Sequence, residues 1–118
     1  MEYEEKKEVK REKVYNLYRC GYLEVRDWLQ ETDIVLIPLG SMEQHGRHLP
    51  VCTDGLATEI PCQMAAELAN VPYMPMIPIG YSPQHLHPAG IGSGTVCFSA
   101  TTYQNMLCLL YTSDAADE

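Results

Sequence analysis

The stretch Ile34-Val35-Leu36-Ile37-Pro38-Leu39, followed directly by Gly40-Ser41, decides the fold of this chain. Every position from 34 to 39 is apolar, so the run lacks the alternation of apolar and polar side chains that marks a half-buried strand. A short run of this kind, rich in β-branched residues, is typical of a strand buried on both faces of a parallel sheet. The sequence therefore predicts an interior strand over residues 34–39, with a loop directly after it.

A helix is expected next, from about Gly55 to Asn70. Its large apolar residues Ile60, Met64 and Leu68 recur at every fourth position. That spacing predicts one apolar helix face, which we expect to pack in the core against the strand.

The segment before the strand is expected to be helical. Residues 2–19 are rich in helix formers and in Glu–Lys pairs, which predicts a solvent-facing helix. Residues 23–31 predict a short amphipathic helix with Trp28 in the core.

Beyond the first strand–helix pair, the pattern of elements repeats. Residues 73–79 contain two prolines and directly follow a third, Pro72, which predicts an extended segment at the edge of the sheet. A long loop over residues 80–95 follows, then a short strand over 96–98 and a helix that begins near residue 101. Strands that alternate with helices predict a layered α/β fold.

The composition excludes several classes of protein. The chain has 118 residues, 8 basic against 16 acidic, with a formal net charge of −8. A nucleic-acid-binding protein would need clustered positive charge instead. No apolar run approaches the roughly 18 residues that span a bilayer, and residues 1–13 lack the apolar segment of a secretory signal. We expect a cytoplasmic protein with neither nucleic acid nor membrane as partner.

The last eleven residues, 108–118, read Cys-Leu-Leu-Tyr-Thr-Ser-Asp-Ala-Ala-Asp-Glu and resemble a translated sequencing adaptor. A segment of that origin contributes nothing to a fold. The prediction is therefore a domain over residues 1–107 and an artefactual tail over 108–118. A genuine, frayed acidic C-terminus is the alternative.

Glu43, His45 and Asp54 are candidate metal ligands. They follow the end of the predicted strand, which is where open α/β sheets bind their ligands. The sequence there reads Pro38-Leu39-Gly40-Ser41-Met42-Glu43-Gln44-His45-Gly46-Arg47-His48-Leu49-Pro50, and Thr53-Asp54 comes shortly after it. Glu43 and His45 share a face if the segment is extended, and Asp54 opens the next helix. Carboxylates and imidazole suit Zn²⁺ or Mn²⁺. From the spacing alone, an ordinary polar loop with Asp54 as a helix cap remains equally possible.

The run from residue 36 to 54 resembles the creatininase family pattern: an apolar strand, then Gly-Ser-x-Glu-Gln-His-Gly-x-His-Leu-Pro, then Thr-Asp. Tyr81-Ser82-Pro83-Gln84-His85 and Gly94-Thr95-Val96 resemble later family landmarks, although members often carry Phe-Pro-Gly-Thr where this chain has Gly92-Ser93-Gly94-Thr95. The similarity covers residues 23–107. It implies that residues 1–107 are the N-terminal part of a hydrolase domain, a three-layer α/β/α sandwich with a mainly parallel sheet, truncated in this chain.

The resemblance also implies a centre with two divalent ions, Zn²⁺ and/or Mn²⁺. Asp54 would bridge the ions, Glu43 would bind one and His45 the other. A hydroxide between the ions would then attack the carbonyl of a non-peptide amide, cyclic or linear. Three ligands that meet at such a centre should have donor atoms within about 3–6 Å of one another. Without a cation, crowding two carboxylates is expected to raise the pKa of at least one.

Further roles are implied by the resemblance alone. Ser82 and His85 would belong to the pocket for a small-molecule amide substrate, and His48 would support a metal ligand by a hydrogen bond. The remaining ligands, a His and a Glu, come from a downstream segment that this chain lacks, so the chain itself is expected to be inactive and its parent to be a homo-oligomer. The alternatives are a formamide hydrolase or cofactor-precursor peptidase of the same family, or a non-catalytic α/β module that binds a metal or a partner.

Overall fold

The computed structural model describes residues 12–86 and 94–112. The helices of these ranges, in chain order, are the short 3₁₀ helix η1 (Leu17–Arg19), α1 (Tyr22–Glu31), α2 (Thr53–Ala69), the short 3₁₀ helix η2 (Pro83–His85) and α3 (Ala100–Thr112). The three α-helices lie where the sequence predicts them. None of the helices described is long and apolar enough to cross a membrane.

The segment from residue 72 to 80 is the centre of the β pairing. It pairs in parallel with residues 36–40 through backbone hydrogen bonds of 2.8–3.0 Å, and near its start it also pairs in parallel with Asn16. Its end, at Gly80, forms a further parallel bridge with Cys97. These parallel pairings, between segments that alternate with helices, make this an α/β fold with a mainly parallel arrangement.

The pairing consists of isolated bridges because the central segment is rich in proline. Leu36 pairs with Tyr73 and Leu39 with Ile77, so three steps along one segment match four along the other. The central segment therefore carries one extra residue, as in a β-bulge. Pro75 lies within that interval and has no N–H to donate. The register shift thus falls where the backbone lacks a donor.

The positions of the two segments in the sheet are the reverse of the prediction. Residues 72–80 pair on two sides, whereas residues 34–39, within the described part of the chain, pair on one side only. Ile34 and Ile37 are correspondingly exposed, at 58% and 40%. Prolines are tolerated in the central segment because its bridges use the N–H groups of the residues between them, while Pro72 only accepts.

The predicted helix over residues 2–19 is wrong in the part that the structure describes. Residues 12–16 are not helical, and only η1 forms a single turn. Tyr73 takes the backbone groups that a helix would need: its N–H donates to Tyr15 O at 2.8 Å, and its carbonyl accepts from Leu17 N at 2.9 Å. Tertiary pairing therefore overrides local helix propensity here.

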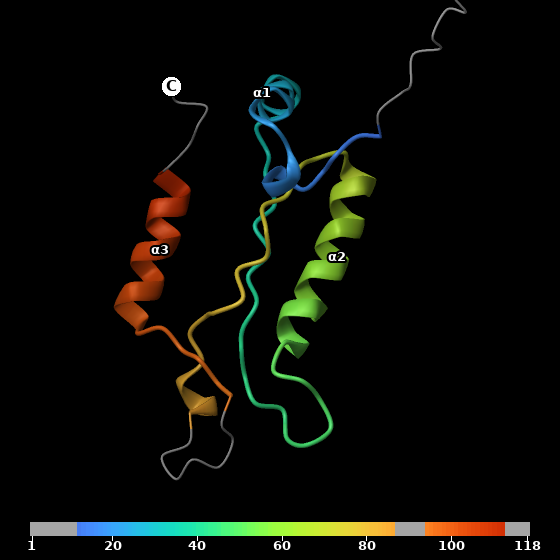
Figure 1. Ribbon diagram of the computed structural model, residues 1–118. Helices are drawn as coiled ribbons and strands as arrows, with labels where there is room; N and C mark the ends of the chain where they lie inside the picture. Colours follow the sequence, from blue (N-terminus) through green and yellow to red (C-terminus); the bar gives the residue numbers. More distant parts are fainter. Residues whose placement is uncertain (1–11, 87–93, 113–118) are drawn as a thin grey trace, which may run out of the picture.

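Helices lie on both sides of the extended segments. Figure 1 shows α2 on one side and α3 on the other, which gives the helix–sheet–helix layering of the predicted sandwich. Close approach of α2 depends on glycine, since a Cβ added at Gly40 would lie 2.9 Å from the Cα of Gly55 and 2.7 Å from the sulfur of Met76. This contact brings the first turn of α2 beside the end of residues 34–39.

The apolar face of α2 points outward, contrary to the prediction that it packs in the core. Its fully buried residues are small, Gly55 and Ala66. Its large apolar residues are exposed, and in sequence order they are Leu56 (45%), Ile60 (53%), Met64 (60%) and Leu68 (88%). Apolar residues at every fourth position do lie on one face of the helix. It is the opposite face, with its small residues, that can come close to the extended segments.

Trp28 of α1 is buried, as predicted, with 4% of its surface exposed. Its indole N–H donates to Val14 O at 2.8 Å, and its ring lies 5.4 Å from that of Tyr15. The ammonium of Lys13 lies 4.3 Å from the indole centroid and bonds to Glu31 at 2.6 Å. Trp28 thereby fixes α1 to the residues that precede it.

Candidate metal centre

The loop between residues 40 and 53 carries the first two candidate ligands. Met42 forms an antiparallel bridge with Val96, and Glu43 N donates to Val51 O at 3.2 Å. The loop turns back on itself at Gly46, whose φ of +71° is a conformation that glycine adopts without strain. Glu43 and His45 are therefore held on a short, internally bonded loop.

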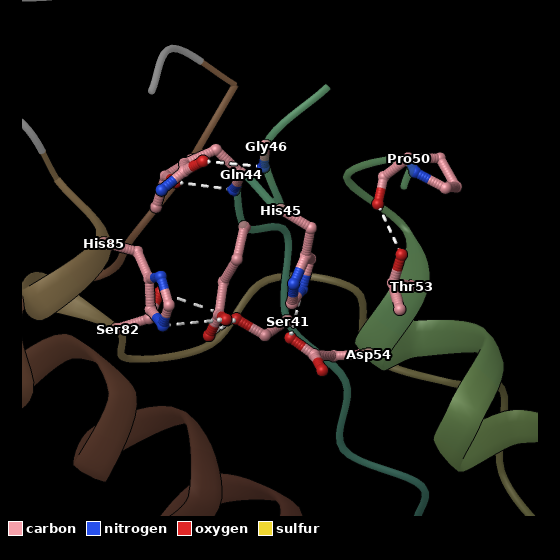
Figure 2. A network of polar contacts seen from close by, with 11 residues as sticks. Ser41, Gln44, His45, Gly46, Pro50, Thr53, Asp54, Ser82 and His85 are labelled. Atoms are coloured by element: carbon pink, nitrogen blue, oxygen red, sulfur yellow. Dashed lines mark hydrogen bonds and ion pairs between the residues drawn. The ribbon is translucent and has the colours of Figure 1, made fainter. Parts of the chain in front are cut away.

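Asp54 belongs to the first turn of α2 and faces this loop. Its Oδ2 lies 3.1 Å from Nε2 of His45. One donor atom each from Glu43, His45 and Asp54 lies within 4.8 Å of the others. Figure 2 shows the side chains of His45 and Asp54 pointing toward each other from the loop and the helix. The predicted convergence of the three side chains is confirmed.

Glu43 is the most buried of the three, and both of its carboxylate oxygens have partners. Ser41 Oγ donates to Oε1 at 2.7 Å, and Nε2 of His85 lies 3.2 Å from Oε2. The side chain of Glu43 is only 12% exposed, against 24% for His45 and 41% for Asp54. The cluster therefore opens to solvent on the Asp54 side.

The pKa of Asp54 lies below its ordinary value. Partial burial raises this pKa, but hydrogen bonds with Glu43 and His45, together with the nearby imidazoles of His45 and His85, outweigh that effect. The predicted rise in the pKa of at least one carboxyl group is therefore not found at Asp54. Among the effects that lower this pKa, the hydrogen bond with Glu43 is the largest, and the contacts with the imidazoles of His45 and His85 follow.

The other three predicted site residues, Ser82, His85 and His48, differ from one another in burial and in the residues they contact. Ser82 is buried, with 1% exposed, and its backbone N–H donates to the sulfur of Cys97 at 3.1 Å. His85 reaches Glu43 and is part of the polar network (Figure 2). His48 is exposed, and among the described residues it has no hydrogen-bond partner through which it would act on a ligand. The predicted roles of Ser82, His85 and His48 stay predictions.

Sequence reasoning missed the part of Ser41 and Thr95 in this network. Ser41 lies two residues before Glu43, so an extended backbone places both side chains on one face, and that spacing was available as a signal. Thr95 Oγ1 accepts from Gln44 N at 2.9 Å across 51 residues, and Gln44 Oε1 accepts from Gly46 N at 3.0 Å. The contact between residues 44 and 95 depends on tertiary packing alone.

The donor set fits a divalent cation. Two carboxylates and one imidazole nitrogen are ligands that Zn²⁺ and Mn²⁺ accept. Within residues 12–86 and 94–112, Glu43, His45 and Asp54 form the group whose geometry could hold an ion. A partly open cluster leaves positions for water or substrate, as catalytic sites require.

Comparisons with protein families and with solved structures both find creatininases. The model of the creatininase family, described as creatinine amidohydrolase, matches residues 19–117, a range that extends into the predicted tail. A crystal structure of creatinine amidohydrolase (creatininase) is 26% identical with a TM-score of 0.73, and the match covers 84% of this chain and 39% of that one. Among the curated proteins, none matches significantly.

Two further solved structures carry metals in their descriptions. A creatininase described as the manganese form and a mutant creatininase of the Zn–Zn type are each 26% identical, with TM-scores of 0.67 and 0.66. Each match covers 76% of this chain and 36% of the other. The chain thus spans little more than a third of the length of the structures it matches.

Proposed function

Because the chain belongs to the creatininase family, we propose that Glu43, His45 and Asp54 are metal ligands of an amidohydrolase that cleaves a non-peptide amide C–N bond. The substrate class is a small cyclic or linear amide. The observation that carries this proposal is the convergence of the three donor atoms within 4.8 Å.

The convergence argues for a cation because two carboxylates and an imidazole nitrogen, which are ligands for Zn²⁺ and Mn²⁺, meet at one place. Two carboxylates are held together, one of them nearly buried, at the point where α2 and the loop meet. Ionised carboxylates at such a distance repel each other unless positive charge lies between or beside them. A divalent ion would supply that charge, and solved relatives described as Zn–Zn and Mn forms support Zn²⁺ or Mn²⁺.

Each residue then has a definite task. Glu43, fixed by its two partners, would hold one side of the centre, and the paired atoms of His45 and Asp54 would hold the other. Asp54 projects from the first turn of the helix toward the other two residues and would hold the metal together with them. Divalent ions in such a centre lower the pKa of water and polarise an amide carbonyl.

The test begins with metal binding by this chain, measured by titration calorimetry with Zn²⁺ and with Mn²⁺. Saturable binding that is lost on chelation is the expected result. Absence of binding by the folded chain would sink the proposed centre. Hydrolysis of creatinine and of a formamide by a protein that continues beyond this chain, with and without Asp54→Asn, then tests the activity.

A further inference from the structure

The carboxylate of Glu43 is held from outside the ligand cluster by two side chains. Ser41 Oγ donates to Oε1 at 2.7 Å, and Nε2 of His85 lies 3.2 Å from Oε2. The contact from Ser41 is a hydrogen bond, and that from His85 is a close pair between an imidazole nitrogen and a carboxylate oxygen. Both contacts leave each oxygen with a further lone pair for a metal.

His85 reaches Glu43 from a firmly anchored turn. It is the last residue of η2, and its backbone N–H donates to Ser82 O at 3.1 Å. Ser82 is 1% exposed, and its own N–H donates to the sulfur of Cys97 at 3.1 Å. The turn follows Gly80, whose carbonyl accepts from Phe98 N at 2.9 Å. The imidazole is therefore carried by backbone that is bonded to the sheet.

Within residues 12–86 and 94–112, the side chains of His45 and Asp54 have no such contact from outside the cluster. His45 Nε2 and Asp54 Oδ2 contact each other, at 3.1 Å, and His45 is joined to His85 only by a ring-to-ring distance of 6.3 Å. Within the cluster, Glu43 is thus the candidate ligand that side chains from outside the cluster orient. Such outer hydrogen bonds orient metal ligands and raise their affinity for the ion.

We propose that His85, together with Ser41, is a positioning residue that orients Glu43 for metal binding. This inference rests on the proposed function, because it takes Glu43 as a metal ligand. It departs from the expectation that His85 lies in the substrate pocket, because Nε2 of its ring lies 3.2 Å from Oε2 of Glu43. His85 acts on the ion through Glu43 and does not coordinate it.

The experiment compares the wild-type chain with His85→Ala, His85→Gln and Gln84→Ala. Gln84 is the matched control, since it is the adjacent residue of the same turn and is exposed. Zn²⁺ and Mn²⁺ affinities are measured by calorimetry, and Co²⁺ is used as a probe whose visible absorption reports the ligands of the ion. Thermal unfolding without metal shows whether each variant is folded.

His85→Ala is expected to lower affinity about 10- to 100-fold, the range found when an outer partner of a ligand is removed. The number of ions bound and the Co²⁺ spectrum stay as in the wild type. The glutamine of His85→Gln keeps an N–H donor near the position of Nε2 and is expected to recover most of the affinity. Gln84→Ala has wild-type affinity.

The outcomes separate this inference from the proposed function. If the wild type binds no metal, both fail. If the wild type binds and both His85 variants bind equally well, the positioning role is overturned and the metal centre stands. A changed Co²⁺ spectrum in His85→Gln, with no recovery of affinity, would show that His85 is itself a ligand and also overturns the role. Should His85→Ala fail to fold, His85→Gln and Ser41→Ala still test the positioning role. Ser41→Ala removes the hydrogen bond from Ser41 to Oε1 of Glu43.

Discussion

His45 and Asp54 contact each other directly, with Nε2 3.1 Å from Oδ2, although one residue lies on a loop and the other on α2. The contact joins the two atoms that would bind an ion, so metal binding has to replace a hydrogen bond that already holds them near each other. The loop and the helix end are thereby arranged for the ion before it arrives, which lowers the ordering cost of binding.

Asp54→Asn should weaken metal binding by at least about 100-fold, because loss of a ligand costs no less than loss of an outer partner. Glu67→Gln is the matched control, since it removes one negative charge from an exposed position of the same helix. Calorimetric titration of both variants and of the wild type with Zn²⁺ measures the two affinity losses. Similar losses in both variants would mean that general charge, and not coordination by Asp54, attracts the ion.

The chain as given should show no measurable amidohydrolase activity. Three ligands hold a second ion weakly, and the matched structures are more than twice as long as the stretch this chain covers. The measurement is turnover of creatinine and of a formamide with added Zn²⁺ or Mn²⁺, against the same metal without protein. Turnover well above that background would show that the described cluster is sufficient for catalysis.

Gly40→Ala should destabilise the fold by about 1–3 kcal/mol, the usual cost of forcing atoms into a packed contact. The new Cβ would meet the sulfur of Met76 at 2.7 Å and the backbone of Gly55 at 2.9 Å. Gly21→Ala is the control, because its Cβ would meet nothing closer than 3.7 Å. Urea unfolding compares the two. Equal free energies of unfolding for the two variants would show that α2 can move away from the added methyl group at no cost.

The interaction of Glu31 with Lys13 and Asn70 should make stability depend on pH at the acid end. The pKa of Glu31 is lowered by the hydrogen bond from Lys13 and then by that from Asn70. A lowered folded pKa means that the contribution is present above the ordinary value of 4.5 and is lost as pH falls through the folded pKa.

We therefore expect Glu31→Gln to be less stable than the wild type near pH 7, and the difference to vanish at pH values well below 4.5. Urea unfolding at a series of pH values measures it. A difference that persists unchanged at the acid end would mean that shape, and not the carboxylate charge, accounts for the role of Glu31.

Ending the chain after Leu107 should leave metal affinity unchanged. The tail prediction places residues 108–118 outside the domain, and none of the contacts described at the metal centre involves residues 108–112. The deletion shortens α3, whose last described hydrogen bonds join Thr112 to Cys108 and Leu109. Calorimetry on both chains is the check, and a large loss of affinity would show that this segment belongs to the domain.

The sequence predicted that the three candidate ligands converge, because their proximity is local. Glu43 and His45 are two residues apart and Asp54 opens the adjacent helix, so strand–loop–helix geometry is sufficient to bring them together. The contact of His85 with Glu43 could not be predicted in this way. It joins segments 42 positions apart, and depends on how η2 is seated on the sheet.

Packing was harder to predict than the elements themselves. Residues 34–39 are extended and paired in parallel, as expected, yet they lie at the edge of the described pairing, while the proline-bearing residues 72–80 lie inside it. The hydrophobicity of a segment indicates only that its burial would be favourable. Backbone donors and side-chain size decide which segment takes the interior position.

The outward row of Leu56, Ile60, Met64 and Leu68 has a consequence for the behaviour of the chain in solution. An exposed apolar stripe along a helix promotes self-association and precipitation, and here the chain's negative charge is what keeps molecules apart. A polar residue in place of Leu68, which is 88% exposed, would raise solubility at almost no cost in folding energy. In α2, the residues that look like a core are the ones that can be replaced, and the glycine and alanine on the opposite face are not.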